Sequence, residues 1–117
     1  MLVSLEKLLE IVNPLRDPPW KEIKDSISTE EVKNSSLSSS KEEYDSLKPE
    51  SREQHIAKIA YFVKHGWNDE PITIVFNKSL YPIYDGNHRL CAAIIRNDDF
   101  ILANVEGNGD LIRKIAY

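Results

Sequence analysis

The sequence predicts a small α/β domain in which a mixed β-sheet is flanked by helices. Its 117 residues are enough for one domain of ordinary size, and a hydrophobic content of 41% can supply a core of modest volume. A helical period of apolar residues over 52–65 and a β-branched run over 72–76 indicate both kinds of element. We therefore expect residues 1–117 to fold as a single domain.

The first 51 residues divide into an apolar start and a polar excursion. Residues 1–3 are expected to form a short strand, and Ser4 is expected to cap a helix that continues towards Val12, where prolines follow. Residues 20–51 are polar and include a serine-dense patch at Asn34 to Ser40, a composition that favours turns over buried structure. We expect this excursion to hold one short helix and to contribute no core.

The rest of the chain is predicted to alternate between helices and strands. A helix is expected from Arg52 to His65, because its apolar residues recur on one helical face and Gly66 suits a left-handed end. Pro82 has no N–H to donate and favours an edge position for its strand. We expect the hairpin 72–84 at the centre of the sheet, with the helix of residues 88–96 packed across it. The predicted elements are strands at 72–76, 80–84 and 101–105 and helices at 88–96 and 111–115.

The sequence Asp85-Gly86-Asn87-His88-Arg89 joins a predicted strand to a predicted helix and is the main candidate for a functional site. Free N–H groups and the positive end of the helix dipole favour an anion there, and Gly86 permits close approach of a phosphate. The positive charge of Arg89 opposes the dipole unless an anion is bound. The alternative is a structural junction, capped by Asp85 or Asn87, with His88 and Arg89 on the surface.

The same stretch resembles the signature of the ParB/sulfiredoxin superfamily, in which a short strand, a glycine turn and an alanine-containing helix follow one another. The resemblance covers about residues 52–107, with a weaker match at 3–16, and corresponds to the core domain of the family alone. It also includes matching residues on either side of the turn: His65, Gly66, Trp67, Pro71, Ile72, Ile74, Ala92 and Ala93.

The resemblance implies a mixed α/β fold and a set of site residues. Gly86, Asn87, His88 and Arg89 would contact the phosphates of a nucleotide, such as ATP or CTP, or of a nucleic acid. His88 and Arg89 would also be catalytic, by stabilising the charge that develops in the reaction. Asp85 would bind Mg²⁺ or Mn²⁺ or orient a catalytic water. In sulfiredoxins a catalytic cysteine precedes the His-Arg pair; Asn87 stands there in this chain, so sulfinic acid reductase activity is not expected.

Further candidates lie outside the turn. The carboxylate of Glu70, next to Asp69, is a candidate general base or metal ligand beside Asp85. His55 borders the buried face of its predicted helix, where it either points towards the same cleft or lies on the helix surface. Aromatic side chains can stack on bases, but in a small domain they more often fill the core and its rim. Those in question are Trp20, Trp67, Tyr81 and Tyr84.

Composition limits the functions that we expect. With 15 basic and 19 acidic residues the net charge is -4, which excludes binding to duplex DNA by phosphate neutralisation alone, so any nucleic acid must be bound at a local site. A single cysteine and the lack of a signal or membrane-spanning pattern predict a cytoplasmic protein. The sequence leaves the oligomeric state open.

The predicted activity is metal-assisted phosphoryl or phosphodiester hydrolysis or transfer, by a ParB-like nuclease or a nucleotide hydrolase. The alternative is a non-catalytic acidic protein of a phage or mobile element that binds and inhibits a host defence complex. The net charge and the polar excursion favour this alternative. The complete Asp-Gly-Asn-His-Arg turn argues against it, because charge mimicry alone does not need such a turn.

Overall fold

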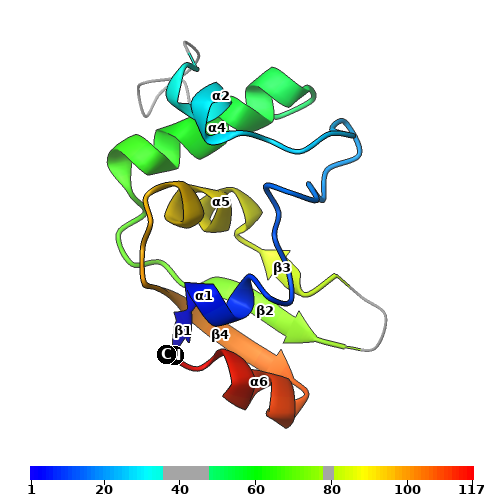
Figure 1. Ribbon diagram of the computed structural model, residues 1–117, viewed down its shortest axis with the longest axis vertical. Coiled ribbons are helices and arrows are strands. Elements are labelled where there is room, and N and C mark those ends of the chain that lie inside the picture. Colours follow the sequence, from blue (N-terminus) through cyan, green and yellow to red (C-terminus); the bar gives the residue numbers. More distant parts are fainter. Residues whose placement is uncertain (36–47, 78–80) are drawn as a thin grey trace.

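A computed structural model describes residues 1–35, 48–77 and 81–117 (Figure 1). Within these ranges no helix combines the length and apolar character that crossing a membrane requires. The elements follow one another as β1 (Leu2–Ser4), α1 (Leu5–Leu8), α2 (Thr29–Lys33), α4 (Arg52–His65), β2 (Ile72–Phe76), β3 (Ile83–Asp85), α5 (Asn87–Ile95), β4 (Phe100–Gly107) and α6 (Gly109–Ile115).

The four strands form a mixed sheet in the order β1-β4-β2-β3, which confirms the predicted fold class. β2 and β4 are parallel, with Ile74 opposite Val105, and the two outer pairs are antiparallel. β3 lies at an edge, as Pro82 predicted. The prediction that the hairpin occupies the centre is wrong, because β4 inserts between β1 and β2 and places the β2–β4 pair in the middle.

The helices form layers on one side of the sheet. In Figure 1 the sheet, α1 and α6 occupy the lower half, α5 lies above the sheet, and α4 and α2 lie above α5. Two hydrophobic cores result, one between the sheet, α1, α5 and α6, and the other between α5, α4 and the segment 15–32. α5 contributes Leu90 and Ala93 to the first core and Cys91 and Ala92 to the second.

The polar excursion contributes to a core, which corrects the sequence-based prediction. Ile23, Ile27 and Val32 are buried in the second core against α4. These apolar residues are separated by charged and polar neighbours, so they form no apolar pattern in the sequence. Arg52 anchors the segment, because its guanidinium donates to the carbonyls of residues 25 and 26. α2 is the short helix that was expected. Most of the serine patch, residues 36–40, lies outside the described residues.

Candidate functional site

The turn from β3 into α5 requires glycine at position 86 for two reasons. Gly86 is the N-cap residue of α5 and has a left-handed conformation, with φ of 103°. A Cβ at this position would lie 2.4 Å from Cγ2 of Ile72. The structure therefore explains the glycine by its close approach to the side chain of Ile72, and the predicted approach of a phosphate stays a prediction.

Arg89 holds this turn against the start of β2. Its guanidinium is buried, with 8% of the residue exposed, and Nη1 donates to the carbonyl oxygens of Glu70 at 3.1 Å and Pro71 at 3.3 Å. Nη2 donates to the carboxylate of Asp85 at 3.1 Å. The structure thus brings Asp85 and the backbone of Glu70 to one guanidinium. Arg89 is not a surface residue, and its contact with a phosphate stays a prediction.

α5 differs from the other described helices at its N-terminus. The other four have both a side-chain cap and an acidic residue in the first turn, whereas α5 has neither. Asn87 uses its amide elsewhere, donating to the carbonyl of Ile83 and accepting from the hydroxyl of Tyr81. The positive end of this helix therefore has no negative side chain in its first turn. The capping residues of the other helices are Ser4, Ser28, Ser51 and Asn108.

His88 belongs to a hydrogen-bonded cluster of side chains from three segments. Its Nε2 lies 2.9 Å from Nδ1 of His55 in α4, and Nε2 of His55 lies 3.4 Å from a carboxylate oxygen of Glu22. The planes of the two imidazoles differ by 10°. Their short N···N contact places the rings edge to edge, and the indole of Trp20 stacks on both, at centroid distances of 4.5 and 4.4 Å.

Burial keeps both imidazoles neutral. The pKa of His88 is lowered to about 3, mainly by burial and further by electrostatic interaction with Lys58, with His55 when that ring is protonated, and with Arg89. Burial also lowers the pKa of His55, which is 4% exposed, while the neighbouring carboxylate of Glu22 acts in the opposite direction. At pH 7 each ring therefore has one N–H and one lone pair.

Sequence reasoning found part of this cluster. The structure brings His55 into hydrogen-bond distance of His88, so His55 does not lie on the helix surface, and its role in a site stays a prediction. Trp20 was considered for base stacking or the core, and it covers the two imidazoles. Glu22 was missed, because it lies in the segment that was expected to be a surface excursion. The sequence around Trp20 and Glu22 offers no signal for their partners, which lie in α4 and α5.

The described residues do not form a metal site of their own. Asp85, the predicted ligand of Mg²⁺ or Mn²⁺, pairs with Arg89, and its side chain is 67% exposed. The residue Glu70 is exposed. Within the described ranges no group of three or more His, Cys, Asp or Glu side chains is arranged to hold a metal ion. Protein ligands alone therefore do not fit a resident cation here, and metal assistance stays a prediction.

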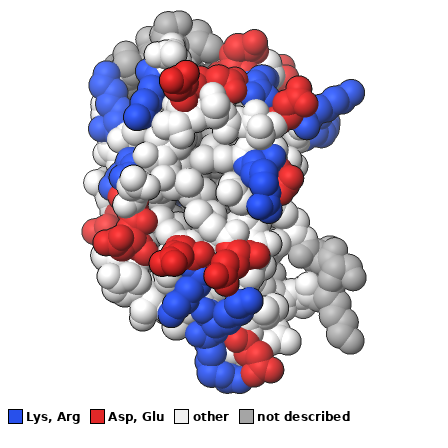
Figure 2. Space-filling view, in the orientation of Figure 1, with Lys and Arg blue, Asp and Glu red and all other residues white. Residues whose placement is uncertain are grey.

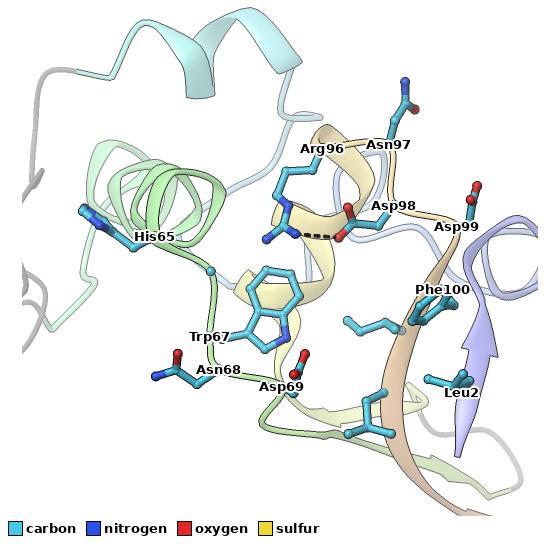
Figure 3. Close-up of a pocket in the computed structure, with 13 residues that line it drawn as sticks. Leu2, His65, Trp67, Asn68, Asp69, Arg96, Asn97, Asp98, Asp99 and Phe100 are labelled. Carbon is cyan, nitrogen blue, oxygen red and sulfur yellow. Dashed lines mark ion pairs between the residues drawn. The ribbon is translucent and has the colours of Figure 1, made fainter.

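A separate hollow of about 820 Å³ lies at the other end of α5 (Figure 3). The guanidinium of Arg96 lies 4.9 Å from the ring centroid of Trp67 and forms an ion pair with Asp98 at 3.4 Å. Of the sequence candidates, His65 and Asp69 also line this hollow. The predicted phosphate-binding residues 86–89 do not line it.

The surface charge and the comparisons add no second candidate. On the face shown in Figure 2, basic and acidic side chains alternate around an uncharged middle band, so no continuous basic surface marks a duplex-binding site on this face. Comparison of the chain with protein-family models, with curated proteins and with solved structures found no match. The features that bear on function are therefore the N-terminus of α5 and the histidine cluster beside it.

Proposed function

We propose that this chain is a ParB/sulfiredoxin-like domain that binds a phosphate group of a nucleotide or a nucleic acid at the N-terminus of α5 and hydrolyses or transfers it. The observation that carries the proposal is the uncapped N-terminus of α5, where Gly86 provides no side-chain cap and the first turn has no acidic residue. A phosphate would supply both the missing acceptor and the missing negative charge. The succession of strand, Asp-Gly turn and alanine-containing helix supports the family assignment.

Backbone and side chains have different roles in this proposal. The N–H groups of Asn87 and His88 bind phosphate oxygens, since they belong to the first turn of α5. Arg89 fixes the turn through the carbonyls of residues 70 and 71 and adds positive charge close to the anion. Asp85 orients that guanidinium through its carboxylate. The turn is therefore already arranged before the ligand arrives.

His88 is the proposed general base. The oxygen of an attacking water or hydroxyl group bonds to phosphorus while the bond from phosphorus to the leaving oxygen breaks. The leaving oxygen keeps the electron pair of that bond, and the proton of the attacking group goes to His88. A neutral imidazole is the form that this step needs. A bound phosphate anion raises the pKa of His88, because it favours the protonated ring.

Calorimetric titration tests the binding half of this proposal. The ligands are inorganic phosphate, ATP, CTP and a short single-stranded DNA, each with and without Mg²⁺ or Mn²⁺. The variant Asn87→Asp adds a negative charge in the first turn of α5, and Asn97→Asp makes the same change in net charge just beyond the other end of the helix. Each variant is first shown to be folded by circular dichroism.

The two variants are expected to behave differently. Asn87→Asp should weaken phosphate binding by about tenfold or more, because like charges within a few ångströms repel each other, whereas Asn97→Asp should leave it nearly unchanged. Equal effects of the two substitutions, or no binding of any ligand to the folded wild-type protein, would refute the assignment. Weaker phosphate binding in Asn97→Asp alone would assign the anion site to the hollow that Asn97 lines, and not to the N-terminus of α5.

The catalytic half is tested by phosphate release from whichever of ATP and CTP binds. His88→Gln should lower turnover by about a hundredfold, in the range typical of a general base. His65→Gln, which changes a histidine at the end of α4, is the matched control and should keep wild-type turnover. Turnover by His88→Gln at the wild-type rate would remove His88 from the mechanism.

A further inference from the structure

The hydrogen-bonded chain from Glu22 through His55 to His88 has a feature that phosphate binding alone does not need. The three side chains come from the segment between α1 and α2, from α4 and from α5, and they meet beneath Trp20. A carboxylate, a buried imidazole and a second imidazole in sequence form a path along which a proton can shift.

The chain of acceptors fixes the tautomer of each ring. The ionised carboxylate of Glu22 can only accept, so Nε2 of His55 carries the hydrogen that it donates. Nδ1 of the neutral His55 then has the lone pair and accepts from Nε2–H of His88. Nδ1 of His88 is left with a lone pair. This nitrogen is bonded to Cγ, so of the two ring nitrogens it is the nearer to the backbone of residue 88, in the first turn of α5.

We propose that Glu22 and His55 are positioning residues that hold His88 with its Nδ1 lone pair towards the phosphate at the N-terminus of α5 and take up the charge that forms there. The inference rests on the proposed function, which supplies the phosphate and the attacking group. When Nδ1 of His88 accepts the proton, the Nε2 proton of His88 shifts to Nδ1 of His55. His88 is then neutral again, and the positive charge is on His55 beside the carboxylate of Glu22.

The charges around the two rings favour this direction of transfer. Arg89 on α5 disfavours a positive charge on His88, whereas Glu22 favours one on His55. Lys58 on α4 disfavours the charge on both rings. The balance therefore places the positive charge on His55. Trp20 covers both rings and limits the access of water to them.

Nitrogen NMR of the ligand-free wild-type protein at pH 7 tests the tautomers directly. We expect both rings to be neutral, with hydrogen on Nε2 and a lone pair on Nδ1. We also expect a scalar coupling across the hydrogen bond between Nε2 of His88 and Nδ1 of His55. A His88 ring that carries its hydrogen on Nδ1 would overturn the inference, whether or not the protein binds phosphate.

Variants of Glu22 test the role in turnover. Glu22→Ala should lower kcat for ATP or CTP by about tenfold or more and change KM by less than about twofold, since it removes charge compensation and leaves the phosphate contacts in place. Glu22→Gln keeps an acceptor for His55 but not the charge, so it should restore the wild-type tautomers without restoring kcat. Glu30→Ala, at an exposed position in α2, is the control and should match the wild type.

The outcomes separate the two proposals. Phosphate binding that responds to Asn87→Asp, together with the opposite tautomer of His88, would refute the relay and keep the phosphate site. The expected tautomers without any phosphate binding would refute the proposed function and with it any role of Glu22 and His55 in catalysis. Unchanged kcat in a folded Glu22→Ala protein would also refute the relay.

Discussion

Replacing Gly86 by alanine should destabilise the protein through two separable effects. A side chain at φ of 103° is strained, at a cost of about 1 to 3 kcal/mol. The new Cβ would also lie 2.4 Å from Cγ2 and 2.7 Å from Cβ of Ile72, and relieving such overpacking costs about 1 to 3 kcal/mol. The lower entropy of the unfolded alanine chain offsets about 0.4 to 1 kcal/mol. The expected net loss is therefore about 1 to 6 kcal/mol.

Gly66→Ala is the matched control for the steric effect. Gly66 also has a positive φ, of 72°, but a Cβ there would meet only Nη1 of Arg96, at 3.8 Å. This variant should lose about 3 kcal/mol or less, because its φ of 72° and ψ of -165° lie in a region that is almost exclusive to glycine, but it lacks the clash. Urea unfolding followed by circular dichroism gives both free energies of unfolding. A net loss below about 1 kcal/mol in Gly86→Ala would refute the argument that Ile72 determines the need for glycine at position 86.

Three further predictions concern titration and reactivity. The folded pKa of His88 is about 3, so the unfolded chain binds a proton at this residue more readily than the folded protein does. The free energy of unfolding should therefore fall as the pH drops from about 6.5 towards 3, by up to about 1.4 kcal/mol per pH unit. Denaturant titrations of His88→Gln should show a shallower fall. Arg52 lowers the pKa of Glu31, and the carboxylate is 40% exposed, so Glu31→Gln should lower the free energy of unfolding by less than about 1 kcal/mol at pH 7. This loss of stability should vanish below the folded pKa of Glu31, where the wild-type carboxyl is also neutral. Equal losses at pH 7 and pH 2 would show that the ion pair with Arg52 is not the cause. Burial raises the pKa of Cys91, so this thiol should react slowly with a thiol reagent in the native protein. The reaction should become faster in urea concentrations below the unfolding midpoint. Rapid labelling of the native protein would show that the second core is open.

Local patterns predicted the elements but not their order in space. The apolar period of residues 52–65 predicted α4, whereas α1 ends at Leu8 and is shorter than the helix towards Val12 that was expected. The position of β4 depends on pairing with both β1 and β2, whose residues lie far away in the chain. The burial of Ile23 and Ile27 depends on α4 in the same way. Neither position leaves a periodic signal in the sequence.

The candidate site was predictable in its backbone and less so in its side chains. The residues from Asp85 to Arg89 predicted the strand, the glycine turn and the helix. One of the two positions considered for His55 was near this turn. The sequence gives no indication that Arg89 turns to the carbonyls of Glu70 and Pro71, since main-chain acceptors have no sequence signature. Glu22 was hidden for a related reason, because it approaches His55 across 33 positions of the chain.

The burial of α5 between two cores has a consequence for cooperativity. Leu90, Cys91, Ala92 and Ala93 are all fully buried; the first and last of these residues face the first core and the middle two face the second. Any opening of α5 exposes both cores at once, so the upper helical layer and the sheet should unfold as one unit. The amide protons in the middle of α5 should therefore exchange with solvent by global unfolding. An anion bound at its first turn would slow exchange across the whole domain rather than at the turn alone.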